Sequence, residues 1–144
     1  MNKIIRFSLI PILAVTTAGL FFMKAQNKPA NASQDRVARG KYIVENVAMC
    51  ERCHTQRDEN GTPDRGHWLM GGPTQTRPTY SAPNWARVEP RLAGAPPGTD
   101  EEFIRLLTTG ISRTGRPPDL PMPPFRMTRE DAESVLAYLK SLTR

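Results

Sequence analysis

The two cysteines of this chain lie three positions apart, in the segment Cys50-Glu51-Arg52-Cys53-His54. They are the only cysteines in 144 residues, and a histidine follows the second one directly. Two thiols at this spacing on a helical turn can reach the two vinyl groups along one edge of a haem and form thioethers. The imidazole of the next residue then lies below the iron, where a proximal histidine is the usual fifth ligand. The segment therefore predicts one covalently attached haem c whose iron is bound by His54.

Three other uses of these residues fit the sequence less well. A dithiol redox pair would lie between a strand and a helix, whereas the residues before Cys50 have a helical pattern. A structural zinc site needs four ligands, and the two cysteines with His54 and His67 match no common zinc-binding spacing. A disulfide within one helical turn closes too short a loop to gain much stability.

A hydrophobic segment lies at the start of the chain. Residues 4–23 are almost wholly apolar and follow Lys3, which is the layout of a secretory signal or an N-terminal membrane anchor. The run has about the length that a helix needs to span a bilayer. Ala30-Asn31-Ala32 offers a cleavage site, but its distance from the apolar run slightly favours a retained anchor. We predict residues 1–32 as signal peptide or anchor plus linker, and residues 33–144 as an exported monohaem domain on the periplasmic side of a bacterial inner membrane.

The N-terminal segment also explains most of the basic charge. The first 32 residues hold four of the 20 Lys and Arg residues and none of the 14 acids, so the formal charge falls from +6 to +2 in the remainder. A nucleic-acid-binding domain would carry a clustered basic surface. We therefore predict no nucleic-acid partner.

A first helix is predicted before the cysteine motif. Ser33 or Asp35 is suited to cap it, and it runs to about Ala48. Its apolar positions are Val37, Tyr42, Val44 and Val47. Gly40 costs about 1 kcal/mol in a helix interior, and we expect the close approach of another backbone to compensate for it.

Two more helices are predicted in the second half. Thr99 and Glu102 form a capping box, and Gly110 is placed to end that helix. Thr128 to Asp131 caps the last helix. Its apolar positions, Ala132, Val135, Leu136 and Leu139, follow the i, i+3, i+4, i+7 spacing of one buried face.

The region between the motif and these helices is irregular. Residues 55–95 contain so many Gly and Pro residues that no long regular element fits. A loop of this length makes sense if it wraps a large apolar ligand in place of core side chains. Trp68, Tyr80 and Trp85 are candidates to pack on the haem or to bind a propionate, with ordinary packing as the alternative.

The proline-rich segment 116–125 offers a second iron ligand. Met122 stands between Pro121 and Pro123, whose fixed φ lowers the entropy cost of holding a thioether at the iron. A sulfur ligand favours the ferrous state and raises the reduction potential. The alternatives are Met127, then Met70 and His67. We predict a single-electron carrier with no catalytic residues, and not an enzyme.

Residues 35–142 resemble a class I cytochrome c. The shared features are Gly40 in a first helix, the Cys-x-x-Cys-His motif, a late Pro-Met-Pro loop and Tyr138-Leu139 in the last helix. Within that family, three segments are similar to the cytochrome domains that serve periplasmic alcohol or aldehyde dehydrogenases. They are Ser81-Ala82-Pro83-Asn84, the acidic helix start before Phe103, and Met122-Pro123-Pro124-Phe125.

This resemblance implies an all-α cytochrome c fold wrapped around one haem, with thioethers at Cys50 and Cys53 and axial ligands His54 and Met122. It implies that the two terminal helices cross near the haem edge, which explains the glycine in the first helix. The expected partners are a donor dehydrogenase and an acceptor oxidase or carrier. Alternatives are an electron-accepting subunit of a dehydrogenase complex and a haem enzyme with an open sixth site. Two prolines, at positions 63 and 73, could supply the carbonyl that orients the proximal histidine.

Overall fold

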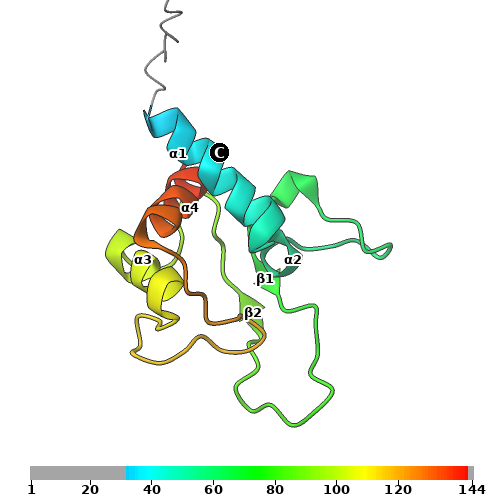
Figure 1. The fold of residues 1–144 in the computed structure, drawn as a ribbon. Coiled ribbons are helices and arrows are strands. Elements are labelled where there is room, and N and C mark those ends of the chain that lie inside the picture. The colour runs from blue at the N-terminus through cyan, green and yellow to red at the C-terminus, as the bar shows by residue number, and fades with distance from the viewer. Residues whose placement is uncertain (1–31, 143–144) are drawn as a thin grey trace, which may run out of the picture.

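Four α-helices, two short helical turns and one pair of two-residue strands make up residues 32–142, the part that the computed structural model describes (Figure 1). In chain order they are α1 (Ala32–Tyr42), the π-helical turn η1 (Ile43–Val47), α2 (Glu51–His54), the 3-10 turn η2 (Arg65–His67), β1 (Gly72–Pro73), β2 (Val88–Glu89), α3 (Asp100–Thr109) and α4 (Arg129–Ser141). The mostly helical prediction is confirmed. The sequence did not predict the antiparallel pairing of β1 and β2, in which Gly72 lies opposite Glu89.

The two terminal helices, α1 and α4, pack against each other (Figure 1). Gly40 lies in their contact. A Cβ added at Gly40 would collide with the backbone carbonyl of Ser134 and would lie 2.8 Å from Cβ of Tyr138. The predicted reason for this glycine is therefore confirmed: it lets a second backbone approach. The approach fixes the position of α1, and with it the position of the cysteine motif that follows.

The first helix ends differently from the prediction. The last residues before the motif form a π-helical turn, in which Ala48 donates to the carbonyl of Ile43 at 2.8 Å. Val44 is buried as predicted, and the wider turn also buries Ile43, which the sequence pattern did not include. Tyr42 and Val47, which the sequence placed on the apolar face, are 52% and 56% exposed.

The predicted N-terminal caps of this helix are also wrong. Ser33 and Asp35 lie inside α1, which already includes Ala32, so neither is the residue that precedes the helix. The sequence favoured Ser33 and Asp35 as N-cap residues because their side chains can accept a hydrogen bond from a backbone N–H. Asp35 still contributes an acidic side chain in the first turn, where the helix dipole favours negative charge.

The later helices match their sequence signals. Thr99 and Glu102 make both hydrogen bonds of the capping box, and Gly110 ends α3 in the left-handed conformation. The Thr128 side chain accepts from the backbone N–H of Asp131 at the start of α4. The four predicted apolar residues of α4 are all buried, in a core cluster shared with residues of α3 such as Phe103.

The predicted N-terminal anchor and most of its cleavage site lie outside the described residues. Within residues 32–142, no helix is both long enough and apolar enough to cross a membrane.

Candidate haem site

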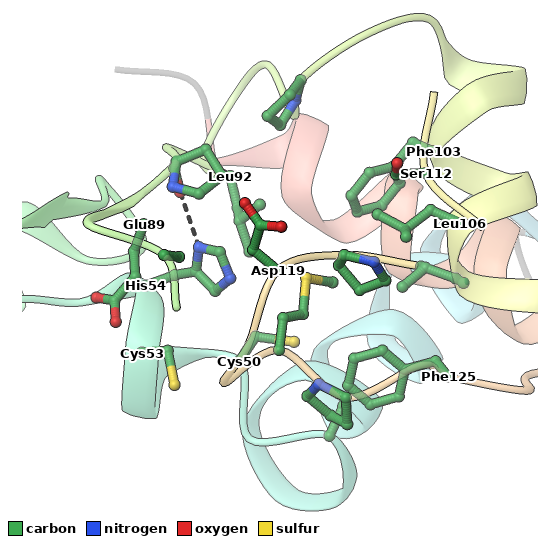
Figure 2. A pocket seen from close by; sticks show the side chains of 18 of the residues that line it. Cys50, Cys53, His54, Glu89, Leu92, Phe103, Leu106, Ser112, Asp119 and Phe125 are labelled. Carbon is green, nitrogen blue, oxygen red and sulfur yellow. Dashed lines mark hydrogen bonds between the residues drawn. The ribbon is translucent and has the colours of Figure 1, made fainter. Parts of the chain in front are cut away.

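A cavity of about 450 Å³ lies between the cysteine motif, β2, α3, α4 and the segment 112–127 (Figure 2). Cys50, Cys53, His54 and Met122 all line it. The structure therefore brings the four predicted site residues to one space, although 72 positions separate the first from the last. Most of the wall is apolar, supplied by residues such as Leu92, Phe103, Leu107, Val135 and Leu139.

His54 is buried and held in one orientation. It is 8% exposed, and its Nδ1 lies 2.8 Å from the carbonyl oxygen of Pro90, as the dashed line in Figure 2 shows. A carbonyl can only accept, so Nδ1 carries the hydrogen and Nε2 keeps its lone pair. Burial lowers the pKa of His54, which the Pro90 hydrogen bond opposes only in part, so the neutral imidazole is favoured. That tautomer is the one a metal requires.

The carbonyl that orients His54 belongs to neither proline that the sequence offered. Pro63 is engaged in a bridge with Arg57, and the carbonyl of Pro73 accepts from the Gln56 side chain at 3.1 Å. Pro90 lies 36 positions beyond the histidine, at the end of the irregular region. Sequence proximity favoured the wrong prolines, because the long loop returns to the motif only after β2.

Gly71 joins the end of α2 to the segment that carries Pro90. Its N–H donates to the carbonyl of His54 at 2.9 Å. Its φ of +70° suits glycine, and an added Cβ would collide with the Glu89 carbonyl and lie 2.6 Å from the Pro90 carbonyl carbon. The sequence showed this residue only as part of a Gly-Gly-Pro turn. Its role in positioning the histidine's partner comes from a tertiary contact.

The two cysteines are free thiols at the cavity wall (Figure 2). Burial raises the pKa of Cys50 to about 12, and burial also raises the pKa of Cys53. Catalytic dithiol pairs work through a lowered thiol pKa, so a redox-active dithiol is not favoured. Within residues 32–142, no group of three or more His, Cys, Asp or Glu residues is arranged to hold a metal ion, which disfavours a zinc site built with His67.

The segment that carries Met122 is fixed by backbone hydrogen bonds to an earlier part of the chain. Leu120 donates to the carbonyl of Asn84 at 3.0 Å and accepts from the N–H of Ala86 at 2.6 Å. Met122 follows two residues later, half-buried at the cavity wall. Pro121, Pro123 and the two backbone hydrogen bonds of Leu120 together limit how far the Met122 thioether can move.

The alternative sixth ligands fall into two groups. Met127 also lines the cavity, but its N–H donates to the carbonyl of Leu107 at 3.0 Å, which ties it to the end of α3. Met70 packs against the core cluster and is not part of the cavity wall. The His67 side chain is 72% exposed and its Nδ1 lies 2.7 Å from a carboxylate oxygen of Asp64. Of the four predicted candidates, Met122 and Met127 therefore line the cavity.

None of the three aromatic candidates for haem contact lies in the cavity wall. Trp68 packs against the core with the Arg65 guanidinium 4.1 Å from its ring centroid. Trp85 donates from Nε1 to the carbonyl of Thr76 at 3.1 Å, and Tyr80 is 62% exposed. In this structure their contacts are those of ordinary packing and surface residues, the alternative that the sequence left open.

The wall also contains charged residues that sequence reasoning missed. They are Glu89, Glu102, Arg113, Arg116 and Asp119. Glu89 is buried, and burial raises the pKa of its carboxyl group. No sequence pattern marked these residues as part of the site, because only the folded chain brings them to the same cavity as the motif.

The cavity fits a haem. Its volume lies within the range of about 300–1,000 Å³ common for cofactor sites. Apolar side chains can cover a flat macrocycle, two thiols stand at one edge, and a neutral imidazole presents its free nitrogen. A helical domain with this arrangement is a c-type cytochrome.

The chain belongs to the cytochrome c family, whose profile matches residues 37–143. Membership implies covalently bound haem c. It also makes the chain an electron-transfer protein rather than a catalytic enzyme.

Two relatives match most of the domain. A protein described as a dihaem cytochrome c-type, from Cereibacter sphaeroides, is 32% identical over 105 residues, covering 71% of this chain and 34% of the relative. The fructose dehydrogenase cytochrome subunit of Gluconobacter japonicus is 31% identical over 114 residues, covering 77% of this chain and 22% of the relative. The chain therefore spans about a third or less of the length of these relatives.

Proposed function

We propose that this domain is a single-electron carrier that holds one haem through thioethers at Cys50 and Cys53, with His54 and Met122 as axial ligands. The observation that carries the proposal is the convergence of these four side chains on one apolar cavity, with Nδ1 of His54 already engaged by Pro90. The haem, when bound, supplies one-electron oxidation and reduction. The protein supplies the ligands, their orientation and an apolar enclosure.

The residues have separable roles in that proposal. Pro90 holds the His54 ring so that Nε2 faces the cavity, and Gly71 holds the Pro90 segment against α2. The apolar wall would exclude water from a bound haem. Pro121 and Pro123 would keep the Met122 thioether in place in both oxidation states, so that little would have to reorganise when an electron moves.

The proposed setting is the periplasmic face of a bacterial inner membrane, with residues 1–32 as signal peptide or anchor. The donor is a dehydrogenase and the acceptor is an oxidase or another carrier. The apolar N-terminal run and the similarity to the cytochrome subunit of a fructose dehydrogenase support this placement.

A second candidate function is that of the electron-accepting subunit within a dehydrogenase complex. The same relative favours it, because that protein is itself described as a dehydrogenase's cytochrome subunit. Purification from native membranes separates the two. A subunit stays with its dehydrogenase through size-exclusion chromatography, whereas a carrier elutes alone.

The first test is covalent haem in the protein made by a strain that matures c-type cytochromes. A denaturing gel stained for haem should show a band at the protein's mass, and the spectrum should be low-spin with the methionine–iron band. A colourless band would end the proposal. A coloured but high-spin protein would instead favour the alternative of a haem enzyme with an open sixth site.

A further inference from the structure

A tight turn at residues 112–116 forms one end of the cavity wall. The N–H of Ser112 donates to the carbonyl of Arg116 at 2.8 Å, and the N–H of Gly115 donates to the carbonyl of Ser112 at 3.0 Å. Arg105 of α3 donates from Nη2 to the same Ser112 carbonyl at 3.1 Å, which ties the turn to the helix. Arg113 and Arg116 project from this turn and line the cavity.

These two arginines differ from most others in the domain, which have partners. Arg39 pairs with Asp131, and Arg129 pairs with Glu101 and Glu133. Within residues 32–142, neither the Arg113 nor the Arg116 guanidinium makes an ion pair or a side-chain hydrogen bond. Two unpaired positive charges therefore stand beside an apolar cavity.

The turn lies away from the cysteines. In Figure 2, Cys50 and Cys53 lie at one end of the cavity and Ser112 lies at the other. A haem carries its two vinyl groups and its two propionates on opposite edges of the macrocycle. A haem bound at the cysteines would therefore direct its carboxylates toward the end where the turn lies.

The acidic residues of the wall do not provide a competing partner at the turn. Glu102 is used in the capping box, where its side chain accepts from the N–H of Thr99 at 2.9 Å. Glu89 is buried beside His54 at the cysteine end, as Figure 2 shows. Asp119 lines the middle of the cavity in the same view and makes no ion pair with a described residue.

We propose that Arg113 and Arg116 bind the two propionates of the haem, an inference that rests on the proposed function. The planar guanidinium presents two parallel N–H donors that match a carboxylate, and such charged hydrogen bonds are stronger than neutral ones. The pair anchors the haem edge that no covalent bond holds. Its positive charge also favours the reduced haem and raises the reduction potential.

The test compares the haem-loaded wild type with the double variant Arg113→Gln/Arg116→Gln. The variant should keep its haem, because the thioethers remain, and should fold, because both side chains are exposed. Its resonance Raman propionate-bending bands should shift and its reduction potential should fall. The variant Arg113→Lys/Arg116→Lys keeps the charge, so it should recover most of the potential but not the wild-type bands.

The matched control is Arg52→Gln. Arg52 is also an exposed arginine without a partner among the described residues, but it lies between the two cysteines at the other end. It should leave the propionate bands unchanged. The inference is overturned if the double variant keeps the wild-type bands, or if Arg52→Gln changes bands and potential as much. Haem staining of the wild type separates these results from a failure of the proposed function, since a colourless wild type would refute that function before any variant is compared.

Discussion

The two sides of the cavity are built in contrasting ways. The proximal wall, made of α2 with residues 69–71 and 89–92, has buried residues in each of its three segments and is joined by several hydrogen bonds. His54 bonds to Pro90, Gly71 bonds to His54, and the carbonyl of Leu69 accepts from both Leu92 and Ala93 at 2.9 and 3.0 Å. The distal wall, residues 111–127, is largely exposed and rests on proline stiffness and a few backbone bonds.

The difference shows which part of the cavity wall is held rigidly and which part is not. The proximal wall fixes one ring in one orientation, so a change at its buried positions, such as Gly71, must disturb the backbone. The distal wall holds its methionine by restricting a loop, so it can lose the side chain and keep the fold. Variants should therefore affect folding when they alter buried positions of the proximal wall. They should affect spectra or reduction potentials when they alter the distal wall.

The largest expected effect is that of Gly40→Val, in the helix crossing that positions the proximal motif. The obstacle is the backbone of Ser134, which cannot move aside as a side chain could. We expect a loss of about 4 kcal/mol in the free energy of unfolding, above the usual overpacking cost of about 1–3 kcal/mol. Urea denaturation followed by circular dichroism measures it.

The control for this variant is Ala38→Val, on an exposed position of the same helix. It should cost about 0.5 kcal/mol, the difference in helix propensity. Equal midpoints for the two variants would show that Gly40 does not face α4.

Gly71→Ala should have the next largest effect. It combines left-handed strain of about 1–2 kcal/mol with a collision against the backbone of residues 89–91. We expect a total of about 3 kcal/mol, and a weaker His54–Pro90 hydrogen bond that shifts the histidine's NMR signals in the haem-loaded protein.

Gly61→Ala separates the two contributions. Gly61 has a similar φ of +77° but nothing within 4 Å of an added Cβ. It should show the conformational cost alone and leave the histidine signals unchanged. If both variants behave alike, Gly71 has no part in positioning the proximal wall.

Met122→Ala tests the distal wall. The thioethers and His54 remain, so the haem should stay bound and the fold should change little. The low-spin methionine spectrum should disappear, the potential should drop and imidazole should bind more tightly, all of which optical titration can follow.

Met127→Ala is the matched variant for this position, since both methionines line the cavity. It should leave the spectrum intact. The reverse result would transfer the ligand role to Met127, and no change in either variant would refute a methionine ligand from this segment.

The smallest effect is expected for Asp64→Asn, in the exposed segment between α2 and residues 69–71. The hydrogen bond from His67 is the main cause that lowers the pKa of Asp64 below its usual value of 3.8. A lowered folded-state pKa stabilises the protein above the unfolded pKa and loses that contribution as the pH falls through the folded value. The gap in urea midpoint between wild type and variant should be small at pH 6 and should close as the pH falls below the usual pKa of 3.8. A gap that widens on acidification would contradict this origin.

The amino-acid sequence by itself determined the local features of this protein. The Cys50–His54 motif, the capping box at Thr99 and the buried face of α4 each depend on residues within one or two turns of one another. Short-range hydrogen bonding and helical periodicity set them. The close approach of another backbone at Gly40 could also be predicted, because a glycine inside a helix needs a compensating contact.

Only the tertiary structure decided which distant groups meet. Pro90 orients His54 because β2 returns the long loop to the motif, and no local pattern distinguishes it from Pro63 or Pro73. The π-helical turn buried Ile43 beside Val44 and left Tyr42 and Val47 exposed. Arg113 and Arg116 came to the cavity through the path of a loop. Loop paths depend on many weak contacts between distant segments, so the same local residues are compatible with several of them.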